Sequence, residues 1–309
     1  MKIKAWFIYV NFLLVIQSFG QQDPMYSMYM FDKVLINPAY AGSSNWAVGT
    51  LKYRQQFIGF GGNPVTQTFN FHSPIQSKHI GVGLKVVNDK MAVLNTLNAT
   101  LQVSYHLNFA GGKLSLGIDG GVYNRRIDYQ KLIVSTKGDN ALSQVPVSST
   151  IPDISYGMYY QKNQFYVGFS EYHLLKKDFN DRTLASSGSH LYKHIYILAG
   201  NVFTLNKYWN WEPNMLMKWQ PGSALQFDFN AMLYYQDRFG AGIQYRTGDA
   251  LAAVLKVNIL ENLRVTFSYD YTLSKLSRYS TGACEVLISY GIKLPPPPVK
   301  KEIHPRYYF

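Results

Sequence analysis

The 309-residue sequence contains a single cysteine and, beyond its first twenty residues, no long apolar run. One cysteine, Cys284, excludes an internal disulfide and a cysteine-based metal cluster. A membrane-spanning helix needs roughly 18 or more consecutive apolar residues. The apolar stretch from Ala5 to Ile16 is shorter than this and is interrupted by Asn11. The sequence therefore predicts neither a disulfide-stapled fold nor a helical membrane protein.

The same short apolar stretch has the pattern of an export signal. Lys2 and Lys4 precede it, and Ser18-Phe19-Gly20 supplies small residues where a signal peptidase cleaves. We therefore expect residues 1–20 to be removed and the mature chain to begin at Gln21. Because no cysteine follows the signal, a lipoprotein anchor is not expected.

Acidic residues are also scarce, 18 against 30 lysines and arginines, so the formal net charge is +12. Such a balance can serve nucleic-acid binding, but no basic run exceeds two residues and the chain is exported. Outer-membrane lipid, anionic lipopolysaccharide and acidic protein partners are the expected counter-charges, and no nucleic-acid partner is expected.

What the sequence has in abundance is strict alternation of apolar and polar residues. Near residue 226, for example, Leu225 and Phe227 fall on one face, and Gln226 and Asp228 fall on the other. Alternation with period two predicts a strand with one apolar face. Fourteen such strands are expected, near residues 45–55, 65–72, 80–88, 95–107, 113–128, 153–161, 164–171, 191–203, 209–218, 224–235, 239–246, 250–259, 263–271 and 283–293.

The lengths of the connections between these segments favour a membrane barrel over a secreted, soluble β-sandwich. Connections after even-numbered segments are short, such as residues 162–163, whereas those after odd-numbered segments tend to be longer, notably residues 129–152 and 172–190. This asymmetry is typical of outer-membrane barrels. The 25 tyrosines and 18 phenylalanines are consistent with aromatic girdles at two membrane interfaces. We expect an all-β fold, a transmembrane antiparallel β-barrel of about 14 strands over residues 45–294, with periplasmic N- and C-termini.

The polar faces of such strands would line the barrel lumen with charges of both signs. A barrel of this size needs an internal filler or will conduct. Residues 21–44 lack clean alternation and are rich in Tyr, Met and Phe, so we expect them to enter the barrel or to cap it from the periplasm; a simple linker is the alternative. The expected lumen residues are Asp228, Arg264, Asp270 and Glu285. The expected cap or plug residues are Tyr29, Phe31, Asn37, Pro38 and Tyr40.

After the last predicted strand the chain continues as a proline-rich tail, residues 295–309. Four consecutive prolines favour extended polyproline II and cannot donate hydrogen bonds to a sheet. We expect the aromatic, basic terminus to dock on a periplasmic component, with a disordered or assembly-related tail as the alternative. The residues expected to make this contact are Arg306, Tyr307, Tyr308 and Phe309.

The sequence announces no catalytic constellation. His190 and His194 are four residues apart, but in a loop that enters a strand this spacing is too wide to chelate a metal. Gly59, Gly61 and Gly62 lack the residues and context of a phosphate-binding loop. We therefore expect no enzyme activity, no cofactor and no metal.

A linked set of motifs covers nearly the whole mature chain. The motifs are Gln22-Asp23-Pro24, Tyr29-Met30-Phe31, Ile36-Asn37-Pro38-Ala39-Tyr40-Ala41-Gly42, Tyr53-Arg54-Gln55-Gln56, Asn88-Asp89-Lys90, Tyr166-Val167-Gly168-Phe169-Ser170, Tyr245-Arg246-Thr247-Gly248-Asp249-Ala250 and Ser268-Tyr269-Asp270-Tyr271-Thr272-Leu273. Together they resemble the PorP/SprF family of type IX secretion system outer-membrane proteins. The resemblance implies a barrel similar to the long-chain fatty-acid transporters, used for protein export and not for small-molecule chemistry.

The resemblance also implies partners. Members of this family are associated with large secreted proteins that carry a type B C-terminal domain, such as gliding adhesins. The implied function is to assist export or surface anchoring of such a client together with other type IX components in the periplasm. Lys176, Lys177 and Arg182 on a long loop are the expected client contacts, with a lipopolysaccharide-facing rim as the alternative. A fatty-acid-like or general solute transporter is the alternative function.

Overall fold

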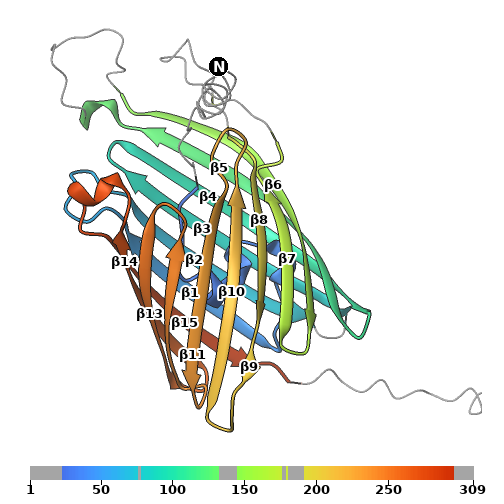
Figure 1. Cartoon of the computed structure of the whole chain (residues 1–309). Helices are drawn as coiled ribbons and strands as arrows, with labels where there is room; N and C mark the ends of the chain where they lie inside the picture. Colours follow the sequence, from blue (N-terminus) through green and yellow to red (C-terminus); the bar gives the residue numbers. More distant parts are fainter. Residues whose placement is uncertain (1–22, 76–77, 132–144, 176–178, 180–190, 296–309) are drawn as a thin grey trace, which may run out of the picture.

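The computed structural model describes residues 23–75, 78–131, 145–175, 179 and 191–295. These residues form a single closed antiparallel sheet (Figure 1). Its strands are β1 (Trp46–Gln55), β2 (Val65–Ile75), β3 (Ile80–Met91), β4 (Leu94–Phe109), β5 (Gly112–Ile127), β6 (Val147–Lys162), β7 (Phe165–Tyr172), β8 (His194–Asn201), β9 (Phe203–Thr204), β10 (Trp209–Trp219), β11 (Gln226–Tyr235), β12 (Phe239–Arg246), β13 (Ala250–Leu260), β14 (Leu263–Thr272) and β15 (Ala283–Lys293).

The short strands β8 and β9 both pair with β10 and lie end to end, interrupted at Val202. They act as one strand, so the barrel has fourteen strands and the predicted fold class is confirmed. The barrel closes where β1 pairs with β15, with Trp46 opposite Lys293 and Arg54 opposite Glu285. Among the described residues, no helix is both long and apolar enough to cross a membrane.

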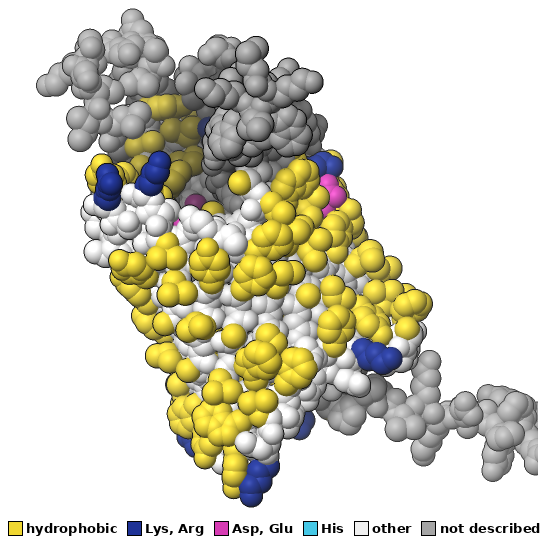
Figure 2. All heavy atoms as spheres, viewed as in Figure 1, with side chains coloured by type: hydrophobic (Ala, Val, Ile, Leu, Met, Phe, Trp, Pro, Cys, Tyr) yellow, Lys and Arg dark blue, Asp and Glu magenta, His cyan; other side chains and the backbone are white. Residues whose placement is uncertain are grey.

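The outer surface of the barrel is apolar between its two ends. On β13, Leu251 and Leu255 are 46% and 56% exposed, whereas their neighbours Ala252 and Val254 are buried. Figure 2 shows hydrophobic side chains spread over the strands, with Lys and Arg gathered toward the ends in this view. A soluble protein rarely exposes so much apolar surface. This face is the lipid-contacting band of a membrane barrel, which excludes the β-sandwich.

The longest connections lie at one end of the barrel, although the two-residue turn at residues 92–93 lies there too. Residues 110–111, 163–164 and 261–262 are two-residue turns at the end that we call the short-turn end. Residues 128–146 and 173–193 are long connections at the opposite end, the long-loop end. Strand β6 begins at Val147, six residues before the predicted start, so the first of these long loops is shorter than expected.

Residues 23–44, which we call the plug, lie inside the barrel (Figure 1). The plug contains three short 3-10 helices, η1 (Tyr29–Phe31), η2 (Lys33–Leu35) and η3 (Pro38–Tyr40). Asp23 contacts His173 at the long-loop end, whereas Asn45 accepts a hydrogen bond from Leu294 at the short-turn end. The first strand thus begins at the end of the barrel at which the last strand ends, the short-turn end. The first described residue, Asp23, lies at the long-loop end. The plug therefore traverses the lumen, and the periplasmic location of the two termini stays a prediction, since both lie outside the described residues.

The helix η3 is positioned by its own sequence and by the barrel wall. The Asn37 side chain accepts a hydrogen bond from the backbone N–H of Ala39, and Pro38 occupies the first helical position. A Cβ added at Gly117 of β5 would lie 2.4 Å from the Ala39 nitrogen, and one at Gly157 of β6 would lie 2.2 Å from Asn37 Oδ1. The two wall glycines therefore allow the plug backbone to approach the sheet closely.

Candidate functional site

The middle of the plug joins a buried cluster of charged side chains on the barrel wall. Arg54 of β1 donates to Asp270 at 2.7 Å and to Glu285 at 2.9 Å, and its side chain is 1% exposed. The Ser27 hydroxyl donates to Asp270 at 2.6 Å and accepts from Arg54 at 3.1 Å. The Ser27 backbone N–H donates to Glu285 at 2.9 Å. The plug thus supplies hydrogen bonds to the buried carboxylates and the arginine of the wall.

This cluster continues around the barrel through a second arginine. Arg246 of β12 lies 3.3 Å from Asp228, 3.5 Å from Asp270 and 3.0 Å from the Ser27 hydroxyl. Lys218 of β10 pairs with Asp228 at 2.8 Å. The predicted lumen residues Asp228, Asp270 and Glu285 therefore belong to one network, in which two arginines meet at a single plug serine.

Arg264, the fourth predicted lumen residue, lies apart from that network. Its guanidinium donates to the Phe31 carbonyl at 3.1 Å and lies 5.4 Å from the Phe31 ring centroid. Among the other predicted plug residues, Tyr29 donates to Asn214 at 2.7 Å, and Tyr40 packs edge-on against Tyr159.

The Asn37 side chain makes two further contacts with the wall. Its amide donates to the backbone carbonyls of Met158 and Phe169, which belong to the neighbouring strands β6 and β7. Pro38, the next plug residue, is buried beside it. The structure therefore brings the predicted plug residues together with the barrel wall. The predicted client and docking residues Lys176, Lys177, Arg182, Arg306, Tyr307, Tyr308 and Phe309 lie outside the described residues.

Two cavities flank the plug. One of about 580 Å³ lies toward the short-turn end and is lined by polar groups such as Lys33, Glu212 and Arg264. The other, of about 520 Å³, lies toward the long-loop end and has a more apolar lining. Plug residues line both cavities, and Ser27, Met28 and Tyr29 between them have no exposed surface. The plug therefore fills the middle of the lumen.

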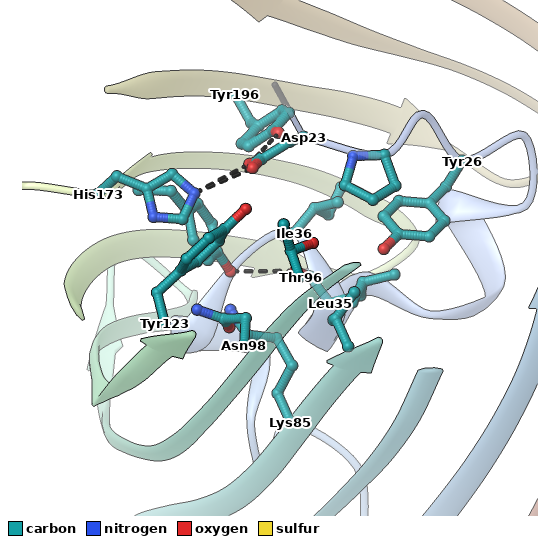
Figure 3. A pocket seen from close by; sticks show the side chains of 13 residues that line it. Asp23, Tyr26, Leu35, Ile36, Lys85, Thr96, Asn98, Tyr123, His173 and Tyr196 are labelled. Atoms are coloured by element: carbon teal, nitrogen blue, oxygen red, sulfur yellow. Dashed lines mark hydrogen bonds and ion pairs between the residues drawn. The ribbon is translucent and has the colours of Figure 1, made fainter. Parts of the chain in front are cut away.

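The start of the plug is fixed at the long-loop end by a buried histidine (Figure 3). His173 lies between two carboxylates: its Nδ1 is 3.0 Å from Asp153, and its Nε2 is 3.0 Å from Asp23. Burial alone would lower the pKa of His173, but the two carboxylates outweigh it and raise the pKa to about 10. Tyr196 also donates a hydrogen bond to Asp23, at 3.3 Å. A charged imidazolium thus ties the first described residue to the barrel wall.

Sequence reasoning missed this cluster because it looked for a partner of His194 nearby in the chain. His190 lies outside the described residues, and the structure instead places His194 beside His173 and Asp23. His173 follows β7 and His194 begins β8, so the two histidines flank one long loop at adjacent strand ends. Two histidines at the facing ends of consecutive predicted strands are the sequence signal that could have identified this pair.

Comparison with known proteins supports the barrel fold and gives the family of the chain. The family model for the type IX secretion system membrane protein PorP/SprF matches residues 18–290. No curated protein matched. Among solved structures, the CymD monoaromatic hydrocarbon channel aligns with TM-score 0.53 and 12% identity, over 89% of this chain and 95% of that chain. A TodX monoaromatic hydrocarbon channel mutant aligns with TM-score 0.50 and 12% identity, over 91% and 98%.

A third solved structure, a Pseudomonas aeruginosa FadL homologue, aligns with TM-score 0.43 and 12% identity, over 80% of this chain and 89% of that chain. At such low identity these likenesses bear on the fold alone. The family match covers most of the chain, from before the plug to residue 290 within β15. The chain is therefore an outer-membrane β-barrel that belongs to the PorP/SprF family of type IX secretion system membrane proteins.

Proposed function

We propose that this barrel assists export of a large secreted protein with a type B C-terminal domain and anchors it at the cell surface, on the long-loop end. The observation that carries the proposal is the plug, because residues 23–44 fill the middle of the lumen with buried, hydrogen-bonded groups. A lumen occupied in this way leaves no room for a polypeptide client. The client is therefore held on an outer surface of the barrel and not inside it.

The long-loop end offers the better docking surface. Its cavity of about 520 Å³ is lined by apolar side chains that include Phe57, Leu94 and Phe179. Met91 and Leu276 line the same cavity and are 46% and 45% exposed. Exposed aromatic, methionine and leucine side chains around a concavity are suited to anchoring a protein partner.

Two charged segments outside the described residues complete the proposal. Lys176, Lys177 and Arg182 belong to the long loop between β7 and β8 and would pair with acidic groups of the client. The tail residues Arg306, Tyr307, Tyr308 and Phe309 would contact other secretion components in the periplasm. Because the last strand ends at the short-turn end, these two sets of contacts fall at opposite ends of the barrel.

The double variant Met91→Ser/Leu276→Ser tests the docking surface. Both side chains are already partly exposed, so the barrel should fold normally. We expect the amount of client that copurifies in mild detergent to fall at least tenfold, since two apolar anchors are removed. Leu205→Ser in the turn at the opposite end is the matched control and should leave copurification unchanged. Equal recovery of the client with the double variant and the control would refute the proposal.

A solute transporter is the second candidate, favoured by the apolar long-loop cavity and by the hydrocarbon-channel descriptions of the two barrels aligned at TM-scores of 0.50 and above. It predicts uptake of hydrophobic solutes by the purified barrel without any protein client. The plug opposes it, because passage requires breaking the Ser27 contacts with Arg54 and Asp270. We propose no enzyme activity, since the sequence contains no motif that supplies a nucleophile and its base.

A further inference from the structure

Three side chains at the long-loop end combine the ligand types and the spacing of a metal site. Asp23, His173 and His194 each offer one donor atom, and the three atoms lie within 4.8 Å of one another. They come from three separate segments: the plug, the residue after β7 and the first residue of β8. We propose that they bind one divalent transition-metal ion of the Zn²⁺ class, which fastens the plug to the barrel wall.

The distances between the donor atoms suit a small ion. His173 Nε2 lies 3.0 Å from Asp23 Oδ1, and His194 Nδ1 lies 3.7 Å from Asp23 Oδ2. Around tetrahedral zinc with bonds of about 2.0–2.1 Å, neighbouring donors are about 3.3 Å apart. The two distances from Asp23 bracket this value, and all three donor atoms lie within 4.8 Å of one another. Two imidazoles with one carboxylate select zinc and related transition ions over calcium or magnesium.

The surrounding groups orient these ligands. Asp153 accepts a hydrogen bond from His173 Nδ1 at 3.0 Å, which leaves Nε2 to face the ion, as in the carboxylate–histidine–metal arrangement of many zinc proteins. His194 would coordinate through Nδ1 in the tautomer that carries its proton on Nε2, a buried atom. Without the ion, His194 Nδ1 donates its proton to the Tyr192 carbonyl at 3.0 Å, so coordination through Nδ1 replaces this hydrogen bond.

Space and charge also favour an ion. A cavity of about 50 Å³ adjoins Asp23 and His173 and is lined by Tyr123 and Tyr196 (Figure 3), which leaves room for a water molecule as the fourth ligand. When zinc binds, it displaces the Nε2 proton of His173. The two positive charges of the ion then balance the carboxylates of Asp23 and Asp153. The cluster therefore gains a neutralising ion without leaving a buried charge unpaired.

Zinc binding by the purified protein tests the proposal. The mature chain is isolated in mild detergent with an affinity tag that contains no histidine, stripped with EDTA and titrated with Zn²⁺ against a chromogenic chelator. We expect one zinc per chain by mass spectrometry. X-ray absorption should show two imidazole nitrogens with oxygen ligands at about 2.0–2.2 Å. If the purified chain binds no zinc, the cluster is only a set of ion pairs and the proposal is overturned.

Variants identify the ligands. His194→Gln and Asp23→Asn should each weaken zinc binding at least tenfold, and Asp153→Asn should weaken it by about 10–100-fold through the orientation of His173. His79→Asn is the control, because His79 lies in a turn at the opposite end with a φ of 57° that asparagine tolerates. Heat-modifiable migration on a gel verifies that each variant forms the barrel. Zinc affinity that is equal in His194→Gln and in the unaltered chain would also overturn the proposal.

Discussion

At the scale of single residues, Arg54 shows how strongly the interior depends on charge pairing. Its guanidinium is buried between Asp270 and Glu285 and also contacts Ser27 of the plug. A buried ion pair adds little net stability when complete, because desolvation offsets the attraction. Loss of one partner is costly, since the remaining charges stay buried without compensation. Arg54 thus specifies where the plug lies more than it strengthens the barrel.

Replacement of this arginine should therefore be strongly destabilising. We expect Arg54→Met to lower the free energy of unfolding by about 3 kcal/mol, because two buried carboxylates lose their main partner. A denaturant titration in detergent, followed by the gel mobility of the folded barrel, measures the change. Lys193→Met is the matched control, since Lys193 pairs with Glu171 at an exposed position. An equal shift of the two transitions would contradict this prediction.

At the scale of elements, the strands could be predicted because their two faces meet different surroundings. On β14, predicted near residues 263–271 and found at Leu263–Thr272, lipid on one side and the polar lumen on the other impose period two. The early start of β6 was not predicted, because the first residues of this strand do not separate an apolar face from a polar one. Ser148 and Thr150 both accept hydrogen bonds from Asn124 outside the apolar band, so this part of the strand has no apolar face to reveal it.

The path of the plug could not be predicted from local sequence. Tyr, Met and Phe content indicated that residues 21–44 are not a simple linker, and the lumen was one of two expected locations. The contacts that fix the path are all distant in sequence, such as Asp23 with His173 and Asn37 with the Met158 carbonyl. Such contacts follow from side-chain geometry inside a closed barrel and leave no periodic trace. The part of Asp23 in the Asp23–His173–His194 cluster is hidden for the same reason.

The fit between plug and wall can be tested with two glycines of the same strand. Gly117 of β5 faces Ala39 closely, so Gly117→Ala places a methyl group against the plug backbone and should loosen it. A Cβ at Gly120 would meet only open space, so Gly120→Ala is the control. We expect Gly117→Ala to raise the conductance of the barrel in planar bilayers and Gly120→Ala to leave it at the level of the unaltered protein. Unchanged conductance in both variants would show that the plug tolerates the added methyl group.

At the scale of the whole molecule, the two ends of the barrel offer different chemistry. The long-loop end has the apolar cavity and the cluster that fixes Asp23. The short-turn end has tight connections, a polar cavity and the end of β15 at Lys293. Pro295 follows after Leu294, and proline cannot donate a hydrogen bond to a sheet. A client held at one end and a secretion component bound at the other would thus be coupled through a rigid, plugged barrel.

Truncation of the tail tests whether the short-turn end carries such a contact. A chain that stops after Leu294 keeps all fourteen strands and the plug, so it should still insert and show heat-modifiable migration. We expect the secreted and surface proteomes to lose the client while other exported proteins persist, because the contact that we propose for Arg306 and Phe309 is removed. Replacing residues 299–309 with a Gly/Ser sequence of equal length separates loss of these side chains from loss of length. If the client still reaches the surface in both variants, the contact with the secretion machine lies elsewhere on the barrel. Loss of all exported proteins would instead indicate that this barrel is a core component of the secretion machine and not a client-specific one.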